Sequence, residues 1–117
     1  MPSHQVVLQK RATQDLEEAY RYAAKRAPLT AASWVNRFHT ALRTLESNPE
    51  RCPLAPENRK TQRAELREFL YGRRPNVFRA VYYIDGNVVR ILRIRRAARR
   101  LLTHQDINDA IDDSADD

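Results

Sequence analysis

The sequence predicts an α+β fold in which an antiparallel helical hairpin covers one face of a mostly antiparallel sheet. Three observations support this class: a short apolar run near the N-terminus, two consecutive amphipathic helical patterns, and three strand-like segments after a proline-rich stretch. The expected order is strand, helix, helix and then a three-stranded antiparallel meander. With 117 residues, the chain has room for one domain of ordinary size.

The N-terminal half predicts a strand followed by two helices. Residues 5–9, QVVLQ, form the expected strand. An apolar stripe with helical spacing predicts a first helix that is capped by Thr13 and ends before Pro28. Thr30 repeats the capping signal, and a second stripe continues to Asn48. Because the connection is short, the two helices should be antiparallel neighbours.

The C-terminal half predicts three strands. Residues 65–71, ELREFLY, could form a strand that ends at Gly72, and residues 76–84 are rich in β-branched and aromatic residues. Residues 88–95, VVRILRIR, form the third segment. Between the last two segments, Asp85-Gly86-Asn87 supplies residues that tolerate positive φ. The last two strands should therefore form a β-hairpin.

A two-residue turn in this hairpin would divide its residues between two faces of the sheet. The apolar face, expected to receive the helices, consists of Phe78, Ala80, Tyr82, Ile84, Val89 and Ile91. The opposite face, expected to be an exposed binding face, consists of Arg79, Val81, Tyr83, Arg90, Leu92 and Ile94. The same alternation would bury Arg93 and Arg95 under the helices. Either the strand twists past the helix ends, or a β-bulge near Arg93 turns the last residues round.

The distribution of charge indicates a polyanionic partner. The formal net charge is +6, but residues 1–105 carry all 21 basic residues against nine acidic ones, a balance of +12. Residues 59–100 alone have a balance of +10. Such a field attracts phosphate backbones or acidic protein segments. The alternative is a solvated basic surface without a partner.

The last residues differ in composition from the rest. Six Asp fall within the last twelve residues, which contain no Lys or Arg. We therefore expect one domain over residues 1–102 and a mobile acidic tail over residues 103–117. The tail could fold back over the arginine face and compete with a partner, or it could serve only solubility.

Several classes of protein are not expected. Cys52 is the sole cysteine, so no internal disulfide can form, and a cytoplasmic location is expected. No His, Cys or carboxylate pairs have the spacing of metal ligands, and no glycine-rich loop could hold a phosphate cofactor. The longest apolar run, residues 80–84, is far too short to cross a membrane.

Five segments, in this order and spacing, resemble the RelE/ParE superfamily of bacterial type II toxins, which includes plasmid stabilisation proteins. The segments are DLEEAYRYAAKRAP, AASWVNRFHTALRTLESNPERCPLAPE, LREFLYG, FRAVYYID and VVRILRIRRAARR. The resemblance covers about residues 5–102 and implies the same order of elements. It also implies a toxin that halts growth and is neutralised by a cognate antitoxin, typically encoded next to it.

The superfamily divides by target. RelE-like members cut mRNA on the ribosome, whereas ParE-like members poison DNA gyrase. In a nuclease, the catalytic residues would be Arg79, Tyr83 and Arg96, of which Arg79 matches the arginine of the RelE-like motif. However, no tyrosine follows Arg100, and the RelE-like lysine pair is replaced at best by Arg73 and Arg74.

The His-Gly pair that ParE-like members usually carry is also absent, since Arg96-Ala97 stands in its place. The match to either branch is therefore incomplete. Because the acid-base residues that the RelE-like resemblance requires are missing, gyrase or an undetermined target is favoured, with a ribosome-dependent mRNA endoribonuclease as the alternative. A non-toxic basic nucleic-acid-binding module is the third possibility. The expected target or phosphate contacts are Arg73, Arg74, Arg79, Arg90, Arg93, Arg95, Arg96, Arg99 and Arg100.

Overall fold

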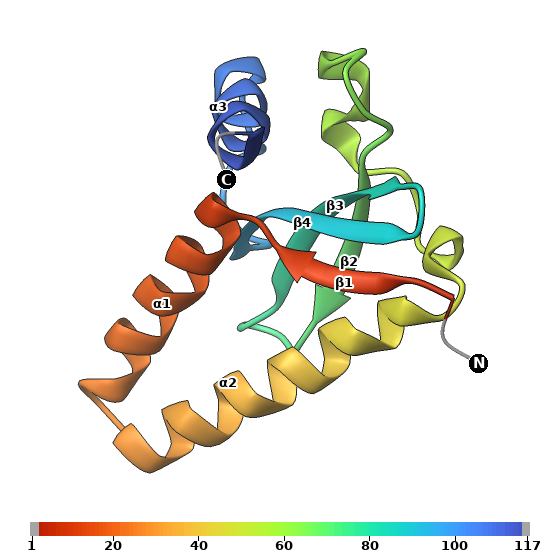
Figure 1. The fold of residues 1–117 in the computed structure, drawn as a ribbon. Helices are drawn as coiled ribbons and strands as arrows, with labels where there is room; N and C mark the ends of the chain where they lie inside the picture. The colour runs from red at the N-terminus through yellow and green to blue at the C-terminus, as the bar shows by residue number, and fades with distance from the viewer. Residues whose placement is uncertain (1–2, 116–117) are drawn as a thin grey trace.

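The computed structural model, which describes residues 3–115, confirms the predicted α+β architecture (Figure 1). The elements in chain order are β1 (Gln5–Leu8), α1 (Lys10–Ala24), α2 (Pro28–Arg43), the 3-10 turns η1 (Thr44–Glu46), η2 (Pro49–Arg51) and η3 (Pro56–Lys60), β2 (Arg67–Tyr71), β3 (Phe78–Asp85), β4 (Val88–Arg96) and α3 (His104–Ala115). No helix in residues 3–115 is long and apolar enough to span a membrane.

The four strands form one mixed sheet in the order β1-β4-β3-β2. The meander β2-β3-β4 is antiparallel as predicted, and β1 adds to β4 in the parallel direction. A parallel neighbour needs a long crossover. The helical hairpin and β2-β3 provide that crossover, which places the first and last strands of the sequence side by side.

The helical hairpin covers one face of the sheet, as its apolar stripes predict. Phe38 and Leu42 of α2 and Leu16 of α1 are buried against Tyr82 and Ile91 of the sheet. The helices begin earlier than predicted, however, since α1 starts at Lys10, with Gln9 as its N-cap after β1, and Pro28 begins α2. Proline fits the first helical position because its missing N–H would have no partner there. Neither Thr13 nor Thr30 is therefore an N-cap.

A β-bulge in the hairpin resolves the alternative left open for Arg93. Val81 pairs with Arg93, but the next residue, Tyr82, pairs with Ile91, so that Leu92 is the extra residue. Beyond the bulge the alternation of β4 is reversed. Ile94 therefore joins the core under the helices. The register pairs Arg93 with Val81 and Arg95 with Arg79, and the guanidinium of Arg93 forms an ion pair with Asp15 of α1.

The prediction that residues 103–117 form a mobile tail is wrong for the residues that the structure describes. Residues 104–115 form helix α3, with Ile107 and Ala110 fully buried. Asp113 pairs with Arg11 of α1, and Asp112 pairs with Arg63 at 2.8 Å. The few apolar residues of α3 are therefore sufficient anchors. Asp116 and Asp117, which the prediction also placed in the tail, lie outside the described residues.

Helix α3 also covers the face that was predicted to bind a partner. Val81 and Leu92 of that face pack against Leu102, Ile107 and Ala110, and against residues of the segment 55–66. Figure 1 shows α3 and this segment on the side of the sheet away from α1 and α2. The sheet is thus buried on both sides, and the prediction of an exposed binding face is wrong.

Candidate functional site

Six of the predicted contact arginines gather where the sheet ends, around the β2–β3 turn and the exit of β4. The guanidinium of Arg96 donates to Asn76 Oδ1 at 3.0 Å, and the backbone N–H of Ala97 donates to Val77 O at 2.8 Å. These bonds join the two segments. We call this region the arginine end, which consists of Arg73, Arg74, Arg95, Arg96, Arg99 and Arg100. All six belong to the predicted contact residues, and all but Arg95 are well exposed.

Arg79 does not belong to this exposed group. Its guanidinium donates to Glu57 Oε2 at 2.7 Å and Oε1 at 2.6 Å, and its Nε donates to Glu68 Oε1 at 2.8 Å. The residue is only 4% exposed. The hydrogen bonds to Glu57 raise the pKa of Arg79 above its usual value, although burial opposes them. Because the guanidinium is buried and held by two carboxylates, it is not available to a phosphate in solution, and its predicted exposure is wrong.

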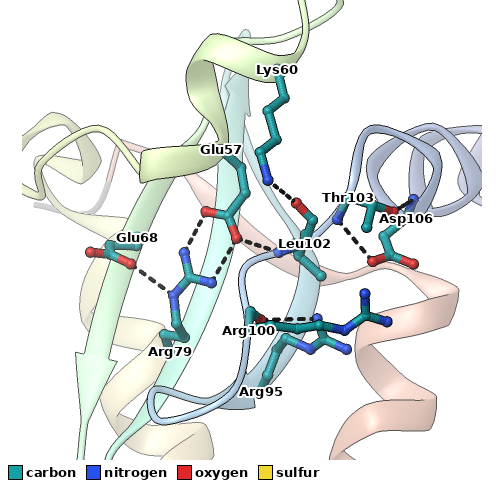
Figure 2. A network of polar contacts seen from close by, with 9 residues as sticks. All are labelled: Glu57, Lys60, Glu68, Arg79, Arg95, Arg100, Leu102, Thr103 and Asp106. Atoms are coloured by element: carbon teal, nitrogen blue, oxygen red, sulfur yellow. Dashed lines mark hydrogen bonds and ion pairs between the residues drawn. The ribbon is translucent and has the colours of Figure 1, made fainter.

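Glu57 also holds the chain that leaves the arginine end (Figure 2). Its Oε2 accepts the backbone N–H of Leu102 at 2.9 Å, and Lys60 Nζ donates to Leu102 O at 2.9 Å. Burial raises the pKa of Glu57, but the bonds from Arg79 and Leu102 and the charge of Arg79 outweigh it and hold the pKa below the usual value. Thr103 and Asp106 then form a reciprocal cap at the start of α3. The loop of residues 97–101 is therefore anchored at both ends.

Two other predicted contact residues lie away from the arginine end. Arg90 pairs with Asp85 at 2.8 Å, at the opposite end of the hairpin. Arg93 pairs with Asp15 of α1 through Nε at 2.8 Å and Nη2 at 3.0 Å. These bonds raise the pKa of Arg93, against the effect of burial. Both arginines therefore have structural partners.

The predicted catalytic residues do not converge on one point. The strand register places Arg96 opposite Phe78, on the helix side of the sheet, whereas Arg79 lies opposite Arg95 on the other side. Tyr83 packs against the buried cluster beneath α3. Burial raises the pKa of Tyr83, although Arg90 lowers it in part. Within residues 3–115, no cluster of His, Cys, Asp and Glu could hold a metal ion.

A groove that sequence reasoning missed opens beside the arginine end. It has a volume of about 710 Å³ and lies between α1, α2 and the end of β4. Its small and apolar lining residues are Ala19, Tyr22, Ala23, Ala27, Ala31, Trp34, Phe78 and Ile94. Its basic residues are Arg26, Arg37, Arg93, Arg95, Arg96 and Arg99, and its acidic residues are Asp15 and Glu18. We call it the helix groove.

The helix groove had a signal in the sequence. Alanines at positions 19, 23 and 27 recur every four residues along α1 and its end. Because these side chains are small, the helix surface there is recessed and leaves room for a partner to pack against it. The apolar stripe was interpreted only as core. A wide groove with cations on its rim suits an apolar segment that carries acidic residues.

Comparisons with known proteins agree with this architecture. Residues 6–101 match the profile of the family described as ParE toxin of type II toxin-antitoxin system, parDE. Among solved structures, a chain of the chromosomal ParDE toxin-antitoxin system from P. aeruginosa superposes with a TM-score of 0.65 at 21% identity. The match covers 82% of this chain and 98% of that one, and the likeness concerns the fold. No curated protein sequence matches this chain significantly.

Proposed function

Because the chain belongs to the ParE toxin family of type II toxin-antitoxin systems, we propose that it halts growth by poisoning DNA gyrase. It is a ParE-like toxin, and its partner is an antitoxin. The arginine end is the surface through which it contacts gyrase. Five well-exposed guanidinium groups there can form bidentate bonds to phosphates or carboxylates of a large target.

The observation that carries this choice over RNA cleavage is the burial of Arg79. Cleavage by attack of the 2′-hydroxyl needs a base, an acid and a cation around one phosphate. Arg79 is held by Glu57 and Glu68, and it lies on the opposite side of the sheet from Arg96. A raised pKa also keeps the phenol of Tyr83 protonated, which makes it a poor general base. A binding function needs none of these groups to converge.

The helix groove is the site at which we place the antitoxin. Eight of its lining residues are small or apolar, and six of its charged lining residues are basic against two acidic ones. An amphipathic segment could bury its apolar side there and direct carboxylates toward Arg96 and Arg99. These two arginines belong both to the groove and to the arginine end. A bound antitoxin would therefore occupy part of the surface that contacts gyrase.

A supercoiling assay with purified gyrase tests the proposal. The toxin should block supercoiling of relaxed plasmid and cause cleaved DNA to accumulate. The double variant Arg96→Ala/Arg99→Ala should lose most of this effect. Arg59→Ala, which removes an exposed arginine of η3, is the matched control and should retain it.

Two results would contradict the proposal. The first is unaffected gyrase together with cleaved mRNA in translating ribosomes, which would favour the nuclease. The second is normal growth of cells that express the chain without an antitoxin, which would favour a non-toxic nucleic-acid-binding module.

A further inference from the structure

A second hollow adjoins the helix groove, between the middle of α2 and the β2–β3 turn, and shares Trp34, Arg37 and Asn76 with it. Figure 1 shows this turn reaching toward α2. The hollow has a volume of about 560 Å³ and is lined by Trp34, Arg37, Tyr71, Gly72, Arg73 and Asn76. We call it the turn pocket. Its volume is in the range of sites that bind small ligands.

The lining of the turn pocket is basic and contains no carboxylate. Arg37 and Arg73 are exposed and take part in none of the ion pairs formed within residues 3–115. Arg37 donates to the hydroxyl of Ser33 at 2.8 Å, a neutral partner that leaves its charge uncompensated. Two guanidinium groups on one small hollow indicate an anionic ligand.

Two aromatic rings line the same hollow in fixed positions. The indole of Trp34 packs edge-on against Phe38 at 5.5 Å and tilted against Phe78 at 5.0 Å between ring centroids. The ring of Tyr71 lies 4.7 Å from that of Phe38. Both Trp34 and Tyr71 remain partly exposed. Rigid aromatic groups beside arginines are typical of surfaces that bind nucleobases together with their phosphates.

Gly72 gives the turn its tight shape. Its φ of +105° lies in a region that other residues rarely adopt, and a Cβ there would come within 2.5 Å of Asn76 O. The backbone N–H of Asn76 donates to Arg73 O at 2.7 Å. The turn therefore closes directly after Tyr71 and brings Arg73 to the pocket.

We propose that the turn pocket binds one nucleotide of a single-stranded nucleic acid. The base contacts Trp34 and Tyr71, and the adjacent phosphate lies between Arg37 and Arg73. Arg74 and Arg96 continue the basic surface beyond the pocket and donate hydrogen bonds to the neighbouring phosphates. An acidic peptide would satisfy the guanidinium groups but would leave the two aromatic rings without a planar partner. The site shares Arg73, Arg74 and Arg96 with the proposed gyrase surface, but its test uses nucleic acid alone and does not depend on the result with gyrase.

Trp34 is the only tryptophan of the chain and lines both hollows, so its fluorescence responds to a bound ligand, and Arg73, which lines only the turn pocket, locates the binding there. The experiment is a titration of the full chain with a short oligothymidylate at low salt. Saturable quenching is expected, and affinity should fall as salt rises. Arg37→Ala and Arg73→Ala should each weaken binding about tenfold, since each removes a charged hydrogen bond. Arg59→Ala serves as the control for general charge and should weaken binding far less.

Other ligands in the same titration decide the chemical class. Inorganic phosphate should quench only at much higher concentration, because it lacks a base. Equal affinity for inorganic phosphate would reduce the pocket to an anion site and overturn the proposal. Equal quenching by polyglutamate would show that the turn pocket binds acidic polypeptides and would overturn the proposal. Equal losses from Arg59→Ala and Arg73→Ala would show attraction by net charge alone, whatever the outcome with gyrase.

Discussion

Arg79 and Glu57 form a buried two-point ion pair, with N–O distances of 2.7 and 2.6 Å. Glu57 is fully buried and Arg79 is 4% exposed. Glu68 supplies a second carboxylate on the Nε side, and Leu102 supplies a backbone N–H to Glu57 (Figure 2). The pair thus joins η3, β3 and the start of the segment that leads to α3. Its members are structural residues, although Arg79 matches a catalytic arginine by resemblance.

The first prediction concerns the loss of Arg79. Arg79→Met leaves Glu57 buried with its carboxylate facing no cation, and Glu68 loses its partner as well. We expect the free energy of unfolding to fall by about 3–5 kcal/mol, as when one partner of a buried pair is removed. Urea unfolding followed by circular dichroism measures this loss. A functional defect of Arg79→Met should therefore follow the fraction of unfolded protein.

Two further variants control this experiment. Arg90→Met removes a more exposed pair with Asp85 and should cost at most about 1 kcal/mol. The double variant Glu57→Gln/Arg79→Met should cost less than the sum of the single changes, because no unpaired charge remains buried. Additive costs would mean that the two residues do not interact as the structure indicates.

The second prediction is a loss of stability in acid. The pKa of Glu57 is lower in the folded chain than its ordinary value of 4.5, so folding favours the charged carboxylate. This stabilisation is complete above the unfolded-state pKa and is lost as the pH falls through the lower folded-state pKa. Asp106, whose pKa is lowered by hydrogen bonds from Thr103, acts in the same direction.

The measurement is urea unfolding at a series of pH values between about 3 and 7. Stability should decline below about pH 4.5 and change little between about 5 and 7. In Glu57→Gln, whose side chain cannot ionise, the free energy of unfolding should fall less steeply as the pH is lowered below about 4.5. The same decline of stability in acid in this variant would exclude Glu57 as a source of the pH dependence.

The periodicity of the sequence was sufficient for the elements that dominate the fold. The stripe that contains Leu16, and the one that contains Phe38, each face the sheet as predicted. The Asp85-Gly86-Asn87 turn placed the alternation of β3 correctly, including buried Tyr82. These features depend on neighbours in the sequence, and simple spacing rules describe them well.

Helix α3 was missed because its composition resembles that of a disordered tail. Its buried apolar residues, Ile107 and Ala110, are few and lie among aspartates. A signal was nonetheless present, since Thr103 and Asp106 have the spacing of a capping pair. What outweighs the acidic composition is the full burial of Ile107 and Ala110, supplemented by long-range ion pairs such as Arg11–Asp113. Charge composition alone does not reveal such pairs.

The site was predicted only in part for similar reasons. The cluster at the arginine end follows from the order of residues along β4 and its exit, which sequence reasoning uses directly. The burial of Arg79 depends on Glu57, 22 residues away in an irregular segment. The bulge at Leu92 reverses the alternation and moves Arg95 away from the helix face. A single extra residue of this kind leaves little trace in the sequence pattern.

The third prediction tests the docking of α3. Ile107→Ala removes a fully buried side chain from the cluster with Val81 and Leu92 and should destabilise the helix by about 2–5 kcal/mol. In hydrogen exchange, the amides of α3 should be protected in the unmodified chain and should exchange faster in the variant. Gln105→Ala, on the exposed side of α3, is the control. Fast exchange of α3 amides in the unmodified chain would support the mobile tail instead.

The fourth prediction concerns Asp15, which connects α1 to the end of β4. Its carboxylate accepts two bonds from Arg93 and one from the backbone N–H of Ile94 at 2.9 Å. Asp15→Asn preserves the shape but replaces one acceptor oxygen by an NH2 group that faces these donors. We expect a loss of about 2–3 kcal/mol in the free energy of unfolding, because bonds to a charged group are affected.

The matched control for this change is Asp85→Asn, at the more exposed pair with Arg90. Its cost should stay within about 1 kcal/mol, since solvent screens that pair. Equal costs for the two variants would mean that Asp15 acts only through its charge on the surface. A larger cost at Asp15 would identify it as the residue that holds α1 against β4, and thereby sets the width of the helix groove at the bulge.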